Sequence, residues 1–230
     1  NNKCFWEFEY IMSQLNVDTI GSQTGSNVQL ASGHTLKDKD GTAFDTQSDM
    51  VKLHSVNVTS AQSTADFFFA DTDWKASLYH SFIVKFRWVR PSDDDRRLYW
   101  AMYNDSTLVS GNYEKHIWYE RIDSSQSGGN GHSYSTDYVD ISSGTTGTGT
   151  REGVRGTIEV FPAKDATASP SVDQQTWWHS HCDVRYENGY SWTADQRGMF
   201  DSATAVNGCR FYMNSGNIAQ GQFDFYGVRR

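Results

Sequence analysis

The sequence predicts a mainly β protein, an antiparallel β-sandwich preceded by an N-terminal arm. Apolar side chains recur at every second residue in several short runs, and residues that favour turns separate these runs. No long stretch carries the apolar stripe of an amphipathic helix. Aromatic residues make up 14% of the 230 residues, so the core of a single domain should be built mainly from aromatic rings.

The predicted strands follow from this alternation and from the positions of β-branched and aromatic residues. The clearest run ends at Pro91 and should bury one face, formed by Phe82, Val84, Phe86 and Trp88. The other strands are expected at residues 50–58, 98–103, 116–122, 134–141, 157–160, 208–213 and 222–228. Turn-forming clusters lie between them, which favours a sandwich or jelly roll over a parallel α/β sheet.

Two segments depart from the strand pattern. Residues 124–150 contain 18 Gly, Ser or Thr among 27 positions and should form a long exposed hairpin or loop, interrupted by the short strand at 134–141. Residues 1–49 are rich in Gly, Ser and Asn, so we expect an assembly or docking arm there and a sandwich domain at 50–230. Because such an arm cannot bury its own rings, its aromatic residues should pack on the domain or on a neighbouring subunit: Phe5, Trp6, Phe8 and Tyr10.

Charge and composition exclude several classes of partner. The net charge of -8 argues against nucleic-acid binding, which needs a basic surface to displace counterions from phosphates. No apolar segment approaches the ~20 residues of a bilayer-spanning helix, so membrane insertion is not expected. The three cysteines, Cys4, Cys182 and Cys209, are an odd and sparse set that we interpret as free thiols, with one disulfide as the alternative.

No catalytic residues are predicted. Sandwich-fold glycosidases need two carboxylates that face each other across one sugar ring. Glu120 and Asp123 are three residues apart and should point to opposite faces of a strand, while Glu7 and Glu9 lie in the arm. We therefore expect a protein that is not an enzyme.

No metal or cofactor site is predicted either. His179 and His181 should share one strand face, but the sequence identifies no further ligands for a metal ion. We interpret them as outward polar residues on a strand that buries Cys182.

A dense aromatic group in the last quarter of the chain is the candidate for glycan or partner binding. It consists of Trp177, Trp178, Tyr186, Tyr190 and Trp192. Flat rings beside hydrogen-bonding side chains suit sugars, whose C–H faces stack on rings while their hydroxyls find polar partners. Adjacent Trp177 and Trp178 should point opposite ways, so one of them belongs to the core. Inter-sheet packing and subunit contact are the alternatives for the whole group.

Three blocks of sequence resemble a family of jelly-roll structural proteins from tailed bacteriophages. The first two span residues 51–67 and 79–113. The third and most specific contains Ala205-Val206-Asn207-Gly208-Cys209, then Ser215-Gly216-Asn217, and closes on Phe225-Tyr226-Gly227-Val228. Its residues 208–213 and 222–228 are expected to form a closing hairpin around the glycine-containing turn.

The resemblance implies a concanavalin-like jelly roll and a non-enzymatic virion protein on the surface of the particle, with a tail fibre or similar appendage as the first interpretation. The implied partners are further copies of the chain, usually as a trimer in fibres, other virion proteins and host-surface glycans. A capsid decoration protein is one alternative. A secreted carbohydrate-binding module without a virion role is the other.

Overall fold

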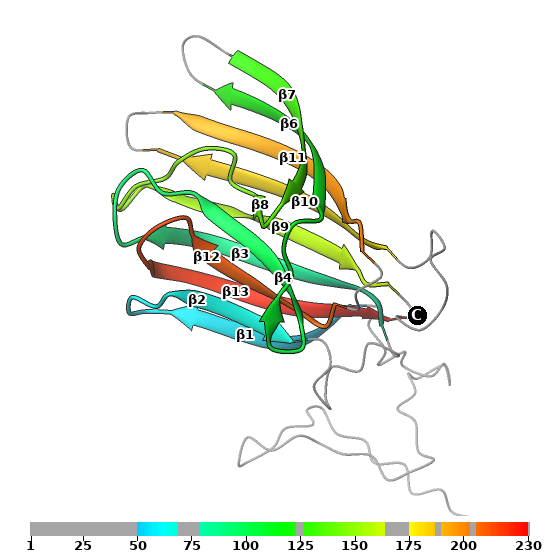
Figure 1. Cartoon of the computed structure of the whole chain (residues 1–230). Helices are drawn as coiled ribbons and strands as arrows, with labels where there is room; N and C mark the ends of the chain where they lie inside the picture. The colour runs from blue at the N-terminus through cyan, green and yellow to red at the C-terminus, as the bar shows by residue number, and fades with distance from the viewer. Residues whose placement is uncertain are drawn as a thin grey trace, which may run out of the picture. The chain divides into compact units, whose positions relative to one another are not determined.

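The computed structural model describes residues 50–68, 79–122, 127–163, 175–186, 190–202 and 206–229, which form two antiparallel sheets packed as a β-sandwich (Figure 1). The predicted fold class is therefore confirmed, whereas the jelly-roll assignment stays a prediction. No described segment is a helix long and apolar enough to cross a bilayer. The predicted arm lies outside the described residues, and with it Phe5, Trp6, Phe8 and Tyr10.

Eight strands form the larger sheet, and each is antiparallel to its neighbours. In spatial order they are β1 (Met50–Val58), β13 (Ile218–Arg229), β3 (Tyr79–Pro91), β9 (Gly153–Phe161), β10 (Thr176–Arg185), β11 (Ser191–Phe200), β6 (Tyr113–Ile122) and β7 (Ser127–Thr136). The smaller sheet contains β2 (Thr64–Phe68), β12 (Gly208–Met213), β4 (Leu98–Asn104) and β5 (Thr107–Leu108), with β8 (Val139–Asp140) paired to β4.

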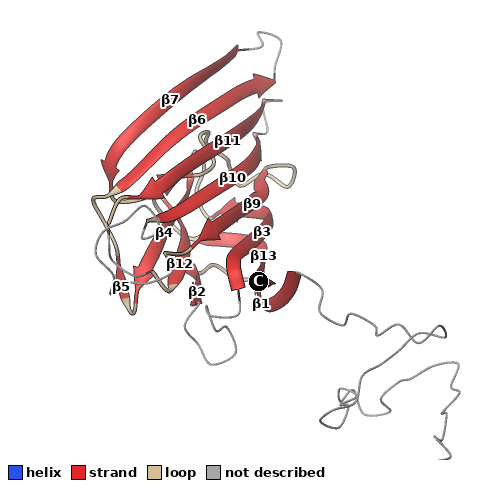
Figure 2. Ribbon diagram, turned by 90° about the vertical axis from the view of Figure 1, so that its right-hand side faces the viewer, coloured by secondary structure: helices blue, strands red, loops and turns tan. Residues whose placement is uncertain are grey.

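The strands of the smaller sheet lie on one side of the larger sheet, and no described element covers its other side (Figure 2). We call these two sides the inner and the outer face. Strand β10 shows the division: the even-numbered residues from Thr176 to Val184 are buried, and the odd-numbered ones from Trp177 to Arg185 are exposed or half-buried. This two-residue alternation is what a sheet with one buried face requires.

Aromatic rings from both sheets fill the space between them, as predicted. Phe67 of β2 stacks on Phe225 of β13 at a centroid distance of 5.3 Å, and Phe211 of β12 reaches Phe223 of β13 at 5.2 Å. All four side chains are fully buried. Because truncating a buried Phe to Ala typically costs about 3–5 kcal/mol, these contacts hold the two sheets together.

Two of the three cysteines are buried in this core as free thiols, as predicted. Burial raises the pKa of Cys182 well above its usual range and that of Cys209 to about 12, because an apolar environment disfavours the thiolate. Cys4 lies outside the described residues.

The predicted closing hairpin at residues 208–213 and 222–228 is wrong. Strand β12 pairs with β2 and β4 in the smaller sheet, whereas β13 pairs with β1 and β3 in the larger one. The intervening turn crosses from one sheet to the other, and Gly216 supplies the positive φ, 75°, expected of its turn residues. The alternation could not separate the two arrangements, since a hairpin and a crossover bury the same side chains.

Residues 124–150 agree only in part with the prediction of a long exposed hairpin or loop: residues 127–134 are exposed or half-buried on a strand that pairs with β6, but the part after residue 138 is mostly buried. The strands in this segment are β7 at residues 127–136 and β8 at 139–140, not one strand at 134–141. Ile141, Ser142 and Thr146, which follow β8, are fully buried. A segment with few apolar groups is thus covered by the rest of the domain, and polar contacts compensate for its burial.

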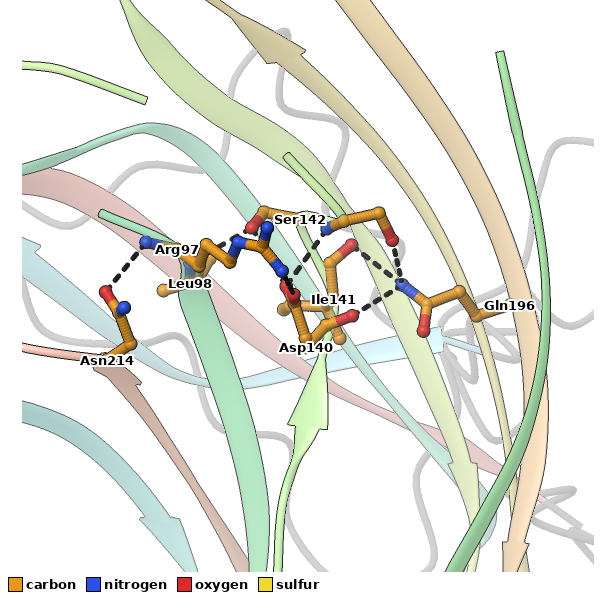
Figure 3. A network of polar contacts seen from close by, with 8 residues as sticks. Arg97, Leu98, Asp140, Ile141, Ser142, Gln196 and Asn214 are labelled. Atoms are coloured by element: carbon orange, nitrogen blue, oxygen red, sulfur yellow. Dashed lines mark hydrogen bonds and ion pairs between the residues drawn. The ribbon is translucent and has the colours of Figure 1, made fainter. Parts of the chain in front are cut away.

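Gln196 of β11 anchors this segment to the inner face of the larger sheet (Figure 3). Its Nε2 donates hydrogen bonds to the carbonyl oxygens of Asp140 and Ile141, at 2.8 and 3.0 Å, and to Oγ of Ser143 at 3.1 Å. The Asp140 carboxylate in turn accepts hydrogen bonds from Nη1 of Arg97 at 2.9 Å and from the backbone N–H of Ser143 at 3.0 Å. This buried network satisfies backbone groups that would otherwise carry a desolvation penalty.

Candidate functional site

The candidate site is the outer face of the larger sheet. In an antiparallel sheet, residues directly opposite each other point to the same side, so the strand registers group outer-face side chains into rows. The first row across β9, β10, β11 and β6 contains Phe161, Trp177, Met199 and Glu114. The second contains Glu159, His179, Arg197 and His116, and continues to His132 of β7. The third contains Thr157, His181, Asp195 and Trp118.

The five aromatic residues predicted to bind a glycan do not form one group. Trp177 lies on the outer face with 48% of its surface exposed, whereas Trp178 is 2% exposed and packs in the core. The ring of Trp178 lies 5.8 Å from that of Trp100 in the smaller sheet. The two adjacent indoles therefore point opposite ways, as predicted, and Trp178 is not part of the site.

Tyr186, Tyr190 and Trp192 lie at the other end of β10 and β11 from Trp177. The guanidinium carbon of Arg121 lies 3.9 Å from the ring centroid of Tyr190 and 5.5 Å from that of Trp192. The hydroxyl of Tyr186 donates a hydrogen bond to Asp95 at 2.9 Å. Trp192 is half-buried and lines the cavity beside Trp88, so of the predicted five only Trp177 is a largely exposed ring.

Trp88 is a residue of the outer face that the sequence pattern assigned to the core. The register of β3 against β9 shifts between Phe86 and Val89, and Trp88 takes a positive φ of 51°. Val89 is buried in its place, and 54% of the surface of Trp88 is exposed. A bulky residue in the left-handed region is uncommon, and here it accompanies the bulge in β3.

The indole of Trp88 borders a cavity of about 250 Å³, which is also lined by Ile122, Arg155, Asp183 and Thr193. Nε of Arg155 lies 3.2 Å from Oδ2 of Asp183, and the hydroxyl of Thr193 donates a hydrogen bond to Oδ1 at 2.8 Å. The carboxylate is thereby held in one orientation beside an exposed ring.

Trp118 lies on β6, next to the edge strand β7, and is level with His181 in the middle of β10. Half of its surface is exposed, and the ring of His116 packs edge-on against it at 4.1 Å. On the neighbouring strands, Nδ1 of His181 lies 2.8 Å from Oδ1 of Asp195, the residue opposite Trp118.

A second hollow of about 300 Å³ lies at the far end of the face and is lined by Glu114, His116, His132, Tyr134, Trp177, Arg197 and Met199. Tyr134 of the edge strand β7 is 63% exposed. Trp177 and Arg185, at opposite ends of β10, are separated by eight residues, or about 27 Å along a strand. Arg185 is paired with Gly153, which lies beside Trp88, so the two hollows lie at opposite ends of β10. We call the strip of outer face between the two hollows the track.

A third hollow, of about 540 Å³, adjoins the first and shares Arg155 and Asp183 with it. It extends the face across β9, β3 and β13 to Lys52 of β1. Nζ of Lys52 lies 2.6 Å from Asp224, and the hydroxyl of Ser55 donates a hydrogen bond to the same carboxylate. Burial by itself would raise the pKa of Asp224, but the contacts with Lys52 and Ser55 outweigh it and lower that pKa.

The predicted arrangement of histidines is confirmed: His179 and His181 share the outer face, and Cys182, the next residue of the same strand, is buried. Among the described residues, no three His, Cys, Asp or Glu side chains are placed to hold a metal ion together. Glu120 points to the outer face, but Asp123, Glu7 and Glu9 lie outside the described residues.

Comparisons with protein-family models, with curated proteins and with solved structures found no match to this chain.

Proposed function

We propose that the outer face of the larger sheet is the binding surface for an extended glycan chain. One observation carries the proposal: three exposed indoles, those of Trp88 on β3, Trp177 on β10 and Trp118 on β6, lie on the same face of the larger sheet. Each exposed indole offers a flat apolar surface with a polar edge, on which a ligand ring can stack.

The chemistry of the face suits sugars more than it suits an apolar partner. Between the indoles lie charged and hydrogen-bonding side chains, among them Asp183 and Asp195, whose positions are fixed by Arg155 and His181. Sugar rings stack their C–H faces on aromatic rings, and their hydroxyls donate hydrogen bonds to such fixed carboxylates. The length of the track, about 27 Å, favours a chain of several sugars over a single one.

We propose binding without turnover. The carboxylates of Asp183, Asp195 and Asp224 are each held by a basic side chain on the same face, and Glu159 accepts a hydrogen bond from Ser81 at 2.6 Å. Acids bound in this way act as fixed acceptors, whereas a glycosidase needs one carboxyl group that is free to give up its proton.

The test is glycan-array screening followed by calorimetric titration with the oligosaccharide that binds best. Trp118→Ala and Trp177→Ala should each weaken binding by about tenfold, since a stacking contact contributes on the order of 1–1.5 kcal/mol. Phe68→Ala is the matched control, because Phe68 is also an exposed ring, at 38%, but belongs to the smaller sheet. The proposal is wrong if no glycan binds, or if the Phe68 variant loses as much affinity as the other two.

The resemblance described above extends this proposal to a virion, where the domain would be a non-enzymatic surface subunit and the glycan a component of the host surface. This extension rests on the resemblance alone. Immunogold labelling of phage particles tests it: label on the tail supports an appendage, and label on the capsid supports a decoration protein. Label on neither, with free protein that binds glycan, supports a secreted carbohydrate-binding module.

A further inference from the structure

The row of side chains next to Trp177 indicates which class of glycan the outer face binds. The strand registers place His179 opposite Arg197, Arg197 opposite His116, and His116 opposite His132. Neighbouring strands lie about 4.8 Å apart, so the four residues form a line about 14 Å long across β10, β11, β6 and β7. A guanidinium and three imidazoles are thus aligned on one exposed surface.

Among the described residues, Arg197 has no carboxylate within ion-pair distance, unlike Arg155 and Arg87 of the same face. Arg155 is paired with Asp183 at 3.2 Å, and Arg87 lies 3.5 Å from Asp224. Arg197 is exposed and lines the hollow beside Trp177. Its planar set of donors is therefore open to a ligand.

We propose that the hollow at Trp177 binds an acidic sugar residue, a uronate or a sulfated sugar, within the glycan chain. This inference rests on the proposed function, because it names the ligand class of the same face. The rings of Trp177 and Tyr134 supply stacking surfaces, and the guanidinium of Arg197 supplies a fork that matches a carboxylate or sulfate. His116 and His132 add donors on the same side.

Other charged groups lie near the row. Glu159 on β9 is hydrogen-bonded to Ser81, Asp195 on β11 is paired with His181 on β10, and Glu114 and Lys115 on β6 line the hollow.

Three oligosaccharide probes test the proposal with the full chain: oligogalacturonate, its fully methyl-esterified form, and a chondroitin sulfate oligosaccharide. We expect at least one of the two acidic probes to bind tenfold or more tightly than the ester. Which acidic probe binds better distinguishes a uronate from a sulfate. Arg197→Gln should weaken binding of that probe by roughly 10- to 100-fold, the range for a hydrogen bond to a charged group, and should leave binding of the ester unchanged.

Two further variants separate recognition of charge from general damage. Arg185→Gln removes another exposed arginine of the larger sheet, at the opposite end of the track from Trp177. This variant should still bind the acidic probe more tightly than the ester. The double variant His116→Gln, His132→Gln removes two imidazoles that line the hollow and should weaken binding of the acidic probe more than binding of the ester.

The outcomes are distinguishable. Equal binding of acid and ester, reduced in Trp177→Ala, overturns the acidic ligand and leaves glycan binding in place. Binding of no probe and no array glycan overturns both proposals. A preference for acid that survives in Arg197→Gln also refutes the assignment to this hollow.

Discussion

Trp88 allows a direct test of the bulge that turns an indole onto the outer face. Its φ of 51° places it in the left-handed region, which costs an L-residue with a side chain about 1–2 kcal/mol and costs glycine almost nothing. Trp88→Ala and Trp88→Gly both remove the indole. Only the glycine variant also relieves the backbone strain.

The expected difference follows from two opposing effects. Glycine is ordinarily less stable than alanine within a strand by about 0.5–1 kcal/mol, because it loses more conformational entropy on folding. Relief of about 1–2 kcal/mol of strain reverses that order, so Trp88→Gly should be more stable than Trp88→Ala by roughly 0.5–1 kcal/mol. Arg87, the preceding residue, does not have a positive φ, and there the alanine variant should be the more stable one.

Urea unfolding of the four variants measures these differences, and titration with the best glycan measures the functional effect. Both Trp88 variants should lose affinity equally, because both lack the ring, although their stabilities differ. If Trp88→Ala proves as stable as Trp88→Gly, the residue is not held in a left-handed conformation and the reasoning from the bulge fails.

Three other predictions concern residues that stabilise the sandwich or are buried in its core. Gln196→Leu should lower the free energy of unfolding by about 2 kcal/mol or more, since two buried carbonyl groups lose their donor, and an unchanged urea midpoint would contradict this. The lowered pKa of Asp224 means that its carboxylate contributes stability above its unfolded pKa, near 3.9, and loses it as the pH falls through the lower folded value. Asp224→Asn should therefore reduce the loss of stability below about pH 4 in acid-unfolding curves, and identical curves would refute the assignment. In a Cys4→Ser background, Cys182 and Cys209 should react with a thiol reagent only after unfolding, because they are buried and their pKa values are raised; labelling of the native protein would show that the core is open.

Some features of the site could be predicted from the sequence because they depend only on the two-residue period of a strand. The opposite directions of Trp177 and Trp178, and the shared face of His179 and His181, follow from that period and are present in the structure. The same period predicted the sandwich and its aromatic core. None of these inferences required knowledge of which strands are neighbours.

The sequence by itself determined the fold class, the inward and outward positions within regular strands, and the turn residue Gly216. Only the tertiary structure decided that β12 and β13 belong to different sheets, that Trp88 faces outward, and that Arg197 stands in line with His116. The reason is that alternation within one strand says nothing about register between strands, and a single bulge reverses the side to which a residue points. The candidate site is made of such cross-strand neighbours, so it becomes visible only when the sheet is assembled.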